Sequence, residues 1–136
     1  MPALAAAGGG ALDHHKSFVV RYRVGEDVQL AAHYDNSEVT LNVNLGVGFE
    51  GGELVFHGQR GAGASAAPRA FLEWDDVGGG VLHLGRHVHA ALPIAQGERL
   101  NFVMWMRSAS WRRAQGCPMC DRTDGLMADQ KASVGF

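Results

Sequence analysis

Two short segments of the sequence carry side chains that could bind a metal ion together. His33 and Asp35 are two residues apart, so in an extended segment both side chains project from one face and can chelate a single ion. Farther along, Arg99 follows His89 by ten residues, and its guanidinium can hold a carboxylate through two parallel hydrogen bonds. Two imidazoles and one carboxylate on one face of a first-row metal ion leave coordination positions open for reactants.

Neither segment is informative by itself. A His-x-Asp pair, or a basic residue ten positions after a histidine, is expected by chance in a chain with 7 histidines among 136 residues. The stretch 81–89 carries three histidines, and each has an ordinary alternative as a surface or core residue. His87 and His89 would share a face of an extended segment, and spacing alone does not choose among His83, His87 and His89.

The segment 38–45 shows the clearest strand pattern in the chain. Apolar and polar residues alternate strictly, which is the period of a β-strand. A polar stripe inside a β-rich region needs hydrogen-bond partners, which the wall of a cavity would supply, although an antiparallel sheet can also turn such a face to solvent. One side carries Val39, Leu41, Val43 and Leu45, and the other carries Thr40, Asn42 and Asn44.

Short apolar runs separated by glycines predict an all-β sandwich or jelly roll. Gly46, Gly48 and the pair Gly51-Gly52 are expected to lie between strands, and residues 58–68 to form a loop. No long amphipathic helix is evident outside the C-terminal tail. The expected strands span residues 18–24, 28–32, 38–45, 53–57, 71–74, 81–84, 88–92 and 99–106.

Bulk composition narrows the class of protein. A chain of 136 residues suits one domain, and 12 basic against 14 acidic residues give no electrostatic footprint for nucleic acid or an anionic membrane. No apolar run is long enough to span a bilayer, and the Ala/Gly-rich start is a poor signal peptide, so the cytoplasm is the default expectation. Cys117 and Cys120 form a single CxxC, which supplies only half of a zinc site.

Taken in order, the motifs resemble the Fe(II)/2-oxoglutarate-dependent dioxygenases, in particular the prolyl 4-hydroxylase and lysyl hydroxylase group. The resemblance covers roughly residues 20–107. Its ordered combination is far more specific than any single motif. It is carried by RYRVGEDVQLAAHYDNSEVTLNVNLG, GGELVFHG and LHLGRHVHAALPIAQGERLNFVMW.

The resemblance implies a double-stranded β-helix (jelly-roll) core over residues 18–107 and assigns roles to individual residues. His33, Asp35 and His89 match the iron ligands, because His89 precedes Pro93, Gly97 and Arg99 at the family's spacing. Arg99 matches the residue that binds the 5-carboxylate of 2-oxoglutarate. The residues expected beside this co-substrate are Tyr22, Asn42 and Asn44. His83 and His87 are then structural residues or neighbours of a ligand.

The resemblance also implies a reaction. Fe(II), 2-oxoglutarate and O2, with ascorbate as a further candidate cofactor, would hydroxylate an unactivated C–H bond and release succinate and CO2. The nearest precedents act on proline or lysine of a protein or peptide, and no side chain beyond the metal site is needed as a catalytic base.

Two alternatives remain open. Residues 1–17 are expected to be disordered or loosely attached and residues 108–136 to be a peripheral tail, so the core would have little N-terminal helical support. The chain could therefore be a catalytically silent or incomplete jelly-roll binding module. A zinc or manganese cupin-like enzyme shares the fold but gives no reason for Arg99 at its spacing.

Overall fold

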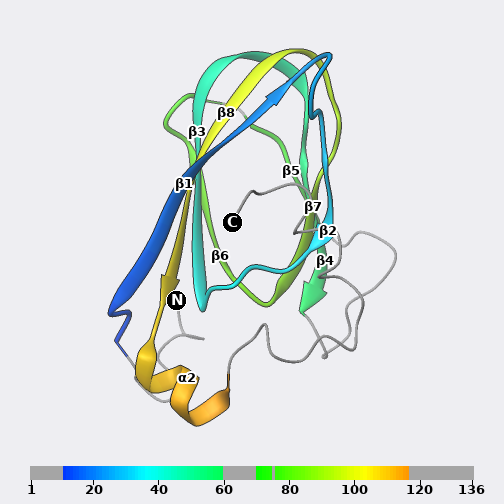
Figure 1. The fold of residues 1–136 in the computed structure, drawn as a ribbon. Helices are drawn as coiled ribbons and strands as arrows, with labels where there is room; N and C mark the ends of the chain where they lie inside the picture. The colour runs from blue at the N-terminus through cyan, green and yellow to red at the C-terminus, as the bar shows by residue number, and fades with distance from the viewer. Residues whose placement is uncertain (1–10, 60–69, 75, 117–136) are drawn as a thin grey trace.

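Two antiparallel β-sheets enclose the core of the chain (Figure 1). The computed structural model describes residues 11–59, 70–74 and 76–116. Within them, one sheet has the strand order β1-β8-β3-β6 and the other the order β2-β7-β4-β5. The prediction of an all-β fold is confirmed. The elements are β1 His14–Arg23, β2 Leu30–His33, β3 Val39–Gly51, β4 Leu54–Gln59, β5 Ala70–Leu72, β6 Gly80–Leu84, β7 His87–Ala91, β8 Ile94–Arg107 and helix α2 Ala109–Gln115.

The chain crosses from one sheet to the other between most consecutive strands, and only β4 and β5 follow each other within one sheet. This alternation is the predicted double-stranded β-helix. Because successive strands lie in opposite sheets, strands distant in sequence, such as β1 and β8 or β2 and β7, pair side by side within one sheet (Figure 1). The topology therefore brings the ends of several strands to one interior site.

Both sheets contribute aromatic and aliphatic side chains to the interior. The rings of Phe18 on β1 and Trp105 on β8 meet edge to face, with centroids 5.0 Å apart, which is a favourable arrangement for aromatic quadrupoles. A buried cluster fills one end of the interior with one residue from each of β1, β4, β7 and β8. Its members are Tyr22, Leu54, Ala91 and Ile94.

Strand β3 is longer than predicted, because glycines that were expected to separate strands lie within it. It runs through Gly46 and Gly48 to Gly51, and its pairing with β8 shifts register between Asn44 and Gly46 and again near Gly51. Gly46 has a φ of +98°, a conformation that favours glycine. Gly46 and Gly48 thus permit irregular pairing within the strand, and the expectation that they lie between strands was wrong, whereas Gly51 and Gly52 do lie where β3 ends.

The segment after β8 begins with a helix tied to the sheets. The Ser108 hydroxyl caps α2 by accepting from the backbone N–H of Trp111. The guanidinium of Arg112 lies 2.9 Å from the carboxylate of Glu38, next to the start of β3. Helix α2 has 7 residues, and no helix in the described part of the chain is long and apolar enough to cross a membrane.

Replacing Gly97 by alanine is expected to destabilise the fold far more than the same change at Gly25. Both have a positive φ, +82° and +91°, so both variants carry backbone strain of about 1–2 kcal/mol. A Cβ on Gly25 meets nothing within 4 Å, whereas one on Gly97 would overlap the carbonyl oxygen of Gly48 in β3. Urea unfolding should therefore show a loss of at least about 3 kcal/mol for Gly97→Ala. Equal losses for the two variants would contradict the close approach of β3 and β8.

Candidate metal and co-substrate site

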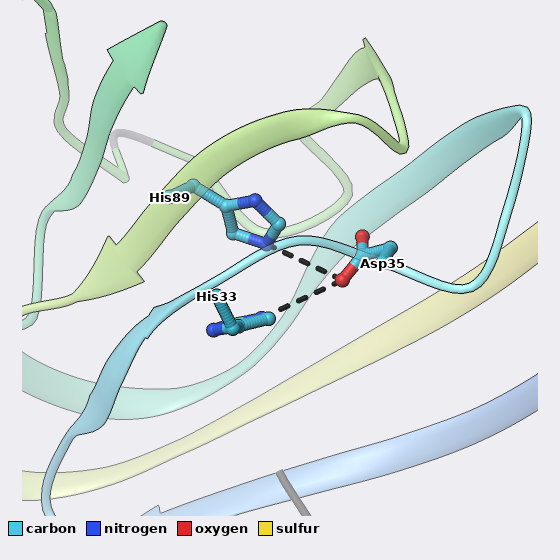
Figure 2. Close-up of side chains that lie close together, drawn as sticks. All are labelled: His33, Asp35 and His89. Carbon is cyan, nitrogen blue, oxygen red and sulfur yellow. Dashed lines mark ion pairs between the residues drawn. The ribbon is translucent and has the colours of Figure 1, made fainter. Parts of the chain in front are cut away.

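The structure brings His33, Asp35 and His89 together at one interior point. His33 ends β2 and pairs across the sheet with His89 on β7, and Asp35 follows two residues after His33. The Nε2 atoms of His33 and of His89 each lie 3.5 Å from Oδ1 of Asp35. Figure 2 shows both imidazoles directed at this carboxylate. One ligand atom from each residue lies within 4.8 Å of the others, and all three side chains are buried. Such a cluster could hold one metal ion.

Backbone carbonyls fix the orientation of both imidazoles. Nδ1 of His33 lies 2.7 Å from the carbonyl oxygen of Ala31, and Nδ1 of His89 lies 2.8 Å from that of His87. A carbonyl only accepts, so Nδ1 carries the hydrogen, and in the neutral ring Nε2 presents its lone pair toward Asp35. Histidines that bind metals are commonly held in this way.

The other carboxylate oxygen of Asp35 is held by a hydroxyl on β3. Thr40 Oγ1 donates to Asp35 Oδ2 over 2.7 Å and lies 2.7 Å from the hydroxyl of Ser37. The backbone N–H of Asp35 donates to the carbonyl of Gly85 over 2.8 Å. A Cβ at Gly85 would overlap the carbonyl oxygen of Ser37, so only glycine allows this close approach. The carboxylate is therefore fixed with Oδ1 directed at the two histidines.

Electrostatics favour the protonation states that a metal ion needs. Burial would raise the pKa of Asp35, but the neighbouring imidazoles of His89, His33 and His83 outweigh it and hold that pKa well below its usual range. Burial lowers the pKa of His89 to about 3, although the carboxylate of Asp35 acts in the opposite direction. Near neutral pH the carboxylate is ionised and the His89 imidazole is neutral, as metal binding requires.

The metal-free chain is expected to lose stability as the pH falls below about 6.5. His89 has a pKa near 6.5 when exposed and about 3 in the fold, so only the unfolded chain takes up this proton as the pH drops. The cost is at most about 1.4 kcal/mol per pH unit. The lowered pKa of Asp35 adds a loss only below about 3.8. Melting temperatures from pH 7.5 to 4.5 should fall less steeply in His89→Gln than in the wild type, with exposed His15→Gln as the control. Identical slopes of melting temperature against pH in His89→Gln and in the wild type would show that His89 is not a buried, neutral side chain.

A cavity between the sheets extends from this cluster to Arg99. Two residues of the predicted polar stripe of β3, Thr40 and Asn42, line this cavity. The remaining wall consists of apolar side chains from both sheets. The polar lining is Tyr22, His33, Asp35, Thr40, Asn42, His89, Arg99 and Asn101.

Arg99 is a buried cation at the cavity wall, with 1% of its surface exposed. Its guanidinium carbon lies 4.3 Å from the centre of the Tyr22 ring, and Nη1 donates to the carbonyl of Gly52. Nε has no hydrogen-bond partner among the described residues. Burial lowers the pKa of Arg99, which nevertheless remains a cation at neutral pH. A buried guanidinium with an unused donor fits a carboxylate ligand.

Asn44 occupies a different place from the other predicted residues. Arg99, Tyr22 and Asn42 line the same cavity as the histidines, but Asn44 is absent from the described lining. Its side chain accepts from the N–H of Gly46 over 2.9 Å and donates to the carbonyl of Asp76 over 3.2 Å. A register shift of β3 against β8 follows directly after Asn44.

Asn101 was missed by the sequence reasoning. Its side-chain Nδ2 donates to Oδ1 of Asn42 over 2.7 Å, which joins β8 to β3 across the cavity wall. The available signal was its position two residues after Arg99 in a strand, which places both side chains on one face.

Comparisons with known proteins agree with this geometry. No protein-family model matches the chain. The 2-oxoglutarate and iron-dependent oxygenase domain-containing protein 2 of Xenopus tropicalis is 45% identical over 130 residues, 95% of this chain and 36% of that protein. The multifunctional procollagen lysine hydroxylase and glycosyltransferase LH3 of Rattus norvegicus is 39% identical over 95 residues, 66% of this chain and 12% of that protein. The chain thus spans about a third of the length of the first of these relatives.

A solved structure shows the same fold. The prolyl hydroxylase from Trichoplax adhaerens, in complex with a hypoxia inducible factor oxygen degradation domain peptide fragment, superposes with a TM-score of 0.58. It is 18% identical, and the match covers 79% of this chain and 50% of that one.

Proposed function

We propose that this chain, which belongs to the 2-oxoglutarate and iron-dependent oxygenases, hydroxylates an unactivated C–H bond of a protein or peptide. One observation carries the proposal. Two imidazole Nε2 atoms and Oδ1 of Asp35 converge in a cavity whose wall also holds Arg99, and the Nε of this guanidinium has no hydrogen-bond partner in the part of the chain that the structure describes. A metal site and a carboxylate site within one cavity match the needs of such an oxygenase.

The donor set fits iron. His33, Asp35 and His89 would hold Fe(II) through two nitrogens and one oxygen, a ligand set that leaves positions open. With O2 and 2-oxoglutarate, the bound iron supplies the oxidation, in which one oxygen atom enters the substrate C–H bond and the other enters succinate as CO2 is released. Thr40 holds Asp35 in place, and the apolar cavity wall limits the access of water. We propose ascorbate as an additional cofactor that acts as a reductant.

The part of the cavity next to Arg99 would bind the co-substrate, 2-oxoglutarate. Arg99 would hold the distal carboxylate of 2-oxoglutarate through its guanidinium, which packs against the ring of Tyr22. Asn42, whose Oδ1 accepts from Asn101, adds a polar amide to the wall of the same cavity. We assign Asn44 no contact with the co-substrate.

The proposed substrate is a proline or lysine side chain of a peptide. Support comes from the names of two matched proteins, a procollagen lysine hydroxylase and a prolyl hydroxylase solved with a peptide fragment. Among the described residues that line the cavity, none other than the groups already assigned is charged, so none of them selects between the two side chains by charge.

Succinate formation tests the proposal. The chain with Fe(II), 2-oxoglutarate and ascorbate should form succinate, and proline- or lysine-containing peptide libraries should increase the rate and gain one oxygen atom by mass spectrometry. A silent binding module would form no succinate, and its melting temperature would not rise with metal and 2-oxoglutarate. Succinate formation without hydroxylation of any peptide would support the oxygenase activity and refute the proposal of a peptide substrate.

A further inference from the structure

The cavity is closed at the end that holds Arg99 and is most accessible where β1 begins and β8 ends. Tyr22 pairs with Arg99 at the closed end, where the two residues are 6% and 1% exposed. His14 pairs with Arg107 at the other end, and 48% of the His14 side chain is exposed. Between these ends, the inward-facing side chains of β1 change from buried Tyr22 to half-buried Lys16. Figure 1 shows the start of β1 and the end of β8 side by side at the end of the molecule that carries α2.

Two cations stand at this open end. Lys16 is the next inward-facing residue of β1 beyond the cavity lining, and Arg107 is the next of β8, because residues two apart in a strand share a face. The guanidinium carbon of Arg107 lies 5.8 Å from the centre of the Trp105 ring, which lines the cavity. Its Nε donates to the carbonyl of Asn36, the residue after Asp35, over 2.7 Å. Arg107 is therefore a neighbour of the metal cluster on its solvent side.

Two carboxylates near the open end have partners of their own. Asp13 accepts from the backbone N–H of Ala109 over 3.0 Å, and the carboxylate of Glu38 lies 2.9 Å from the guanidinium of Arg112. A ligand that enters the cavity thus passes the cations before it reaches the metal cluster. The chain has a formal net charge of −2, which does not suit a polyanion such as nucleic acid. A peptide with an isolated acidic residue fits this end better.

The distance from the metal cluster to the cations matches the spacing of residues in a peptide. Trp105 pairs with Thr40, which donates to Asp35, so the cluster lies level with Trp105. Arg107 is two residues farther along β8, which corresponds to about 7 Å in an antiparallel strand. An extended peptide spans about 3.3–3.6 Å per residue. A carboxylate one or two residues from the side chain at the metal would therefore meet the cations.

We propose that the substrate is a peptide with an aspartate or glutamate one or two residues from the hydroxylated side chain, and that Lys16 and Arg107 bind this carboxylate. This proposal rests on the proposed function, since it requires that the chain hydroxylates a peptide. Arg107 offers a planar fork of donors, and Lys16 offers a mobile ammonium group. An ion pair at a partly exposed site is worth up to about fivefold in affinity, and a charge-assisted hydrogen bond is worth more.

Matched peptides test the substrate class. Two peptides that differ only in aspartate or asparagine at one flanking position are compared by kcat/KM for hydroxylation. The aspartate peptide should be favoured by about fivefold or more, and Lys16→Gln should reduce this preference to about twofold or less. Lys16→Glu should instead favour a peptide with lysine at that position. Lys16 carries the test because Arg107 also holds the backbone beside Asp35. Arg21→Gln is the matched control, because Arg21 lies on the opposite face of β1 and should keep the wild-type preference.

Fluorescence anisotropy of labelled peptides gives a measurement that does not depend on turnover. The aspartate peptide should bind more weakly as NaCl rises from about 0.05 to 0.5 M, whereas the asparagine peptide should change little. Hydroxylation of both peptides with equal kcat/KM, or a preference for aspartate that survives in Lys16→Glu, would overturn the inference and leave the proposed function intact. If Lys16→Glu does not fold, Lys16→Gln decides. Tighter binding of a single-stranded oligonucleotide than of either peptide would also overturn the inference. A chain that hydroxylates no peptide would overturn both.

Discussion

Replacing Asp35 by alanine is expected to lower Fe(II) affinity by more than about 100-fold and to abolish succinate formation. Asp35 is the only carboxylate of the described metal cluster, and its Oδ1 lies 3.5 Å from Nε2 of both His33 and His89. Without it, two neutral nitrogens would remain to hold a dication in a buried site. Calorimetric titration measures the affinity, and a 2-oxoglutarate turnover assay measures the activity.

Asp27→Ala is a suitable control for this variant, because Asp27 is exposed and should leave both quantities unchanged. Asp35→Asn keeps the volume of the side chain, which separates the loss of charge from a packing defect. A folded Asp35→Ala variant with full turnover would refute the assignment of this carboxylate to the metal.

Replacing Arg99 by lysine is expected to raise KM for 2-oxoglutarate by roughly 10–100-fold and to leave the Fe(II) affinity nearly unchanged. Lysine keeps the charge but loses the planar fork, which costs about 1.5–3 kcal/mol for one charge-assisted hydrogen bond. Arg99 is 1% exposed and packs on Tyr22, so the variant also tests whether the buried cation has a ligand. Steady-state kinetics with varied 2-oxoglutarate measure the effect.

Arg21→Lys is the matched control, because Arg21 lies on β1 with half of its side chain exposed and pairs with Glu26. Arg21→Lys should leave the KM for 2-oxoglutarate unchanged. A normal KM in Arg99→Lys would place the co-substrate carboxylate elsewhere. A loss of metal affinity in Arg99→Lys would show that the two halves of the cavity do not act separately.

The sequence predicted those parts of the site that depend on local spacing. His33 and Asp35 come together because they are two residues apart at the end of β2, and Thr40 and Asn42 face the cavity because they alternate along β3. The placement of His89 required the family's order of motifs, since three histidines lie within seven residues and their spacing favoured none of them.

The parts that the sequence did not predict depend on pairing between strands. Asn44 is absent from the described cavity lining and lies at a register shift of β3 against β8, which depends on how the two strands pair. The approach of His83 to the carboxylate of Asp35 arises only when β3 and β6 pair, whereas the hydrogen bond from Thr40 to Asp35 depends on the segment that joins β2 to β3. Leu45, on the apolar side of the predicted strand 38–45, is exposed, whereas Val39 on the same side is buried.

Anomalous scattering from crystals grown with Fe(II) under anaerobic conditions would test the metal site most directly. We expect one ion per chain, bound by Nε2 of His33, Nε2 of His89 and Oδ1 of Asp35, with each ligand atom about 2.0–2.2 Å from the ion. An ion bound elsewhere, or a cluster that remains empty at saturating Fe(II), would contradict it.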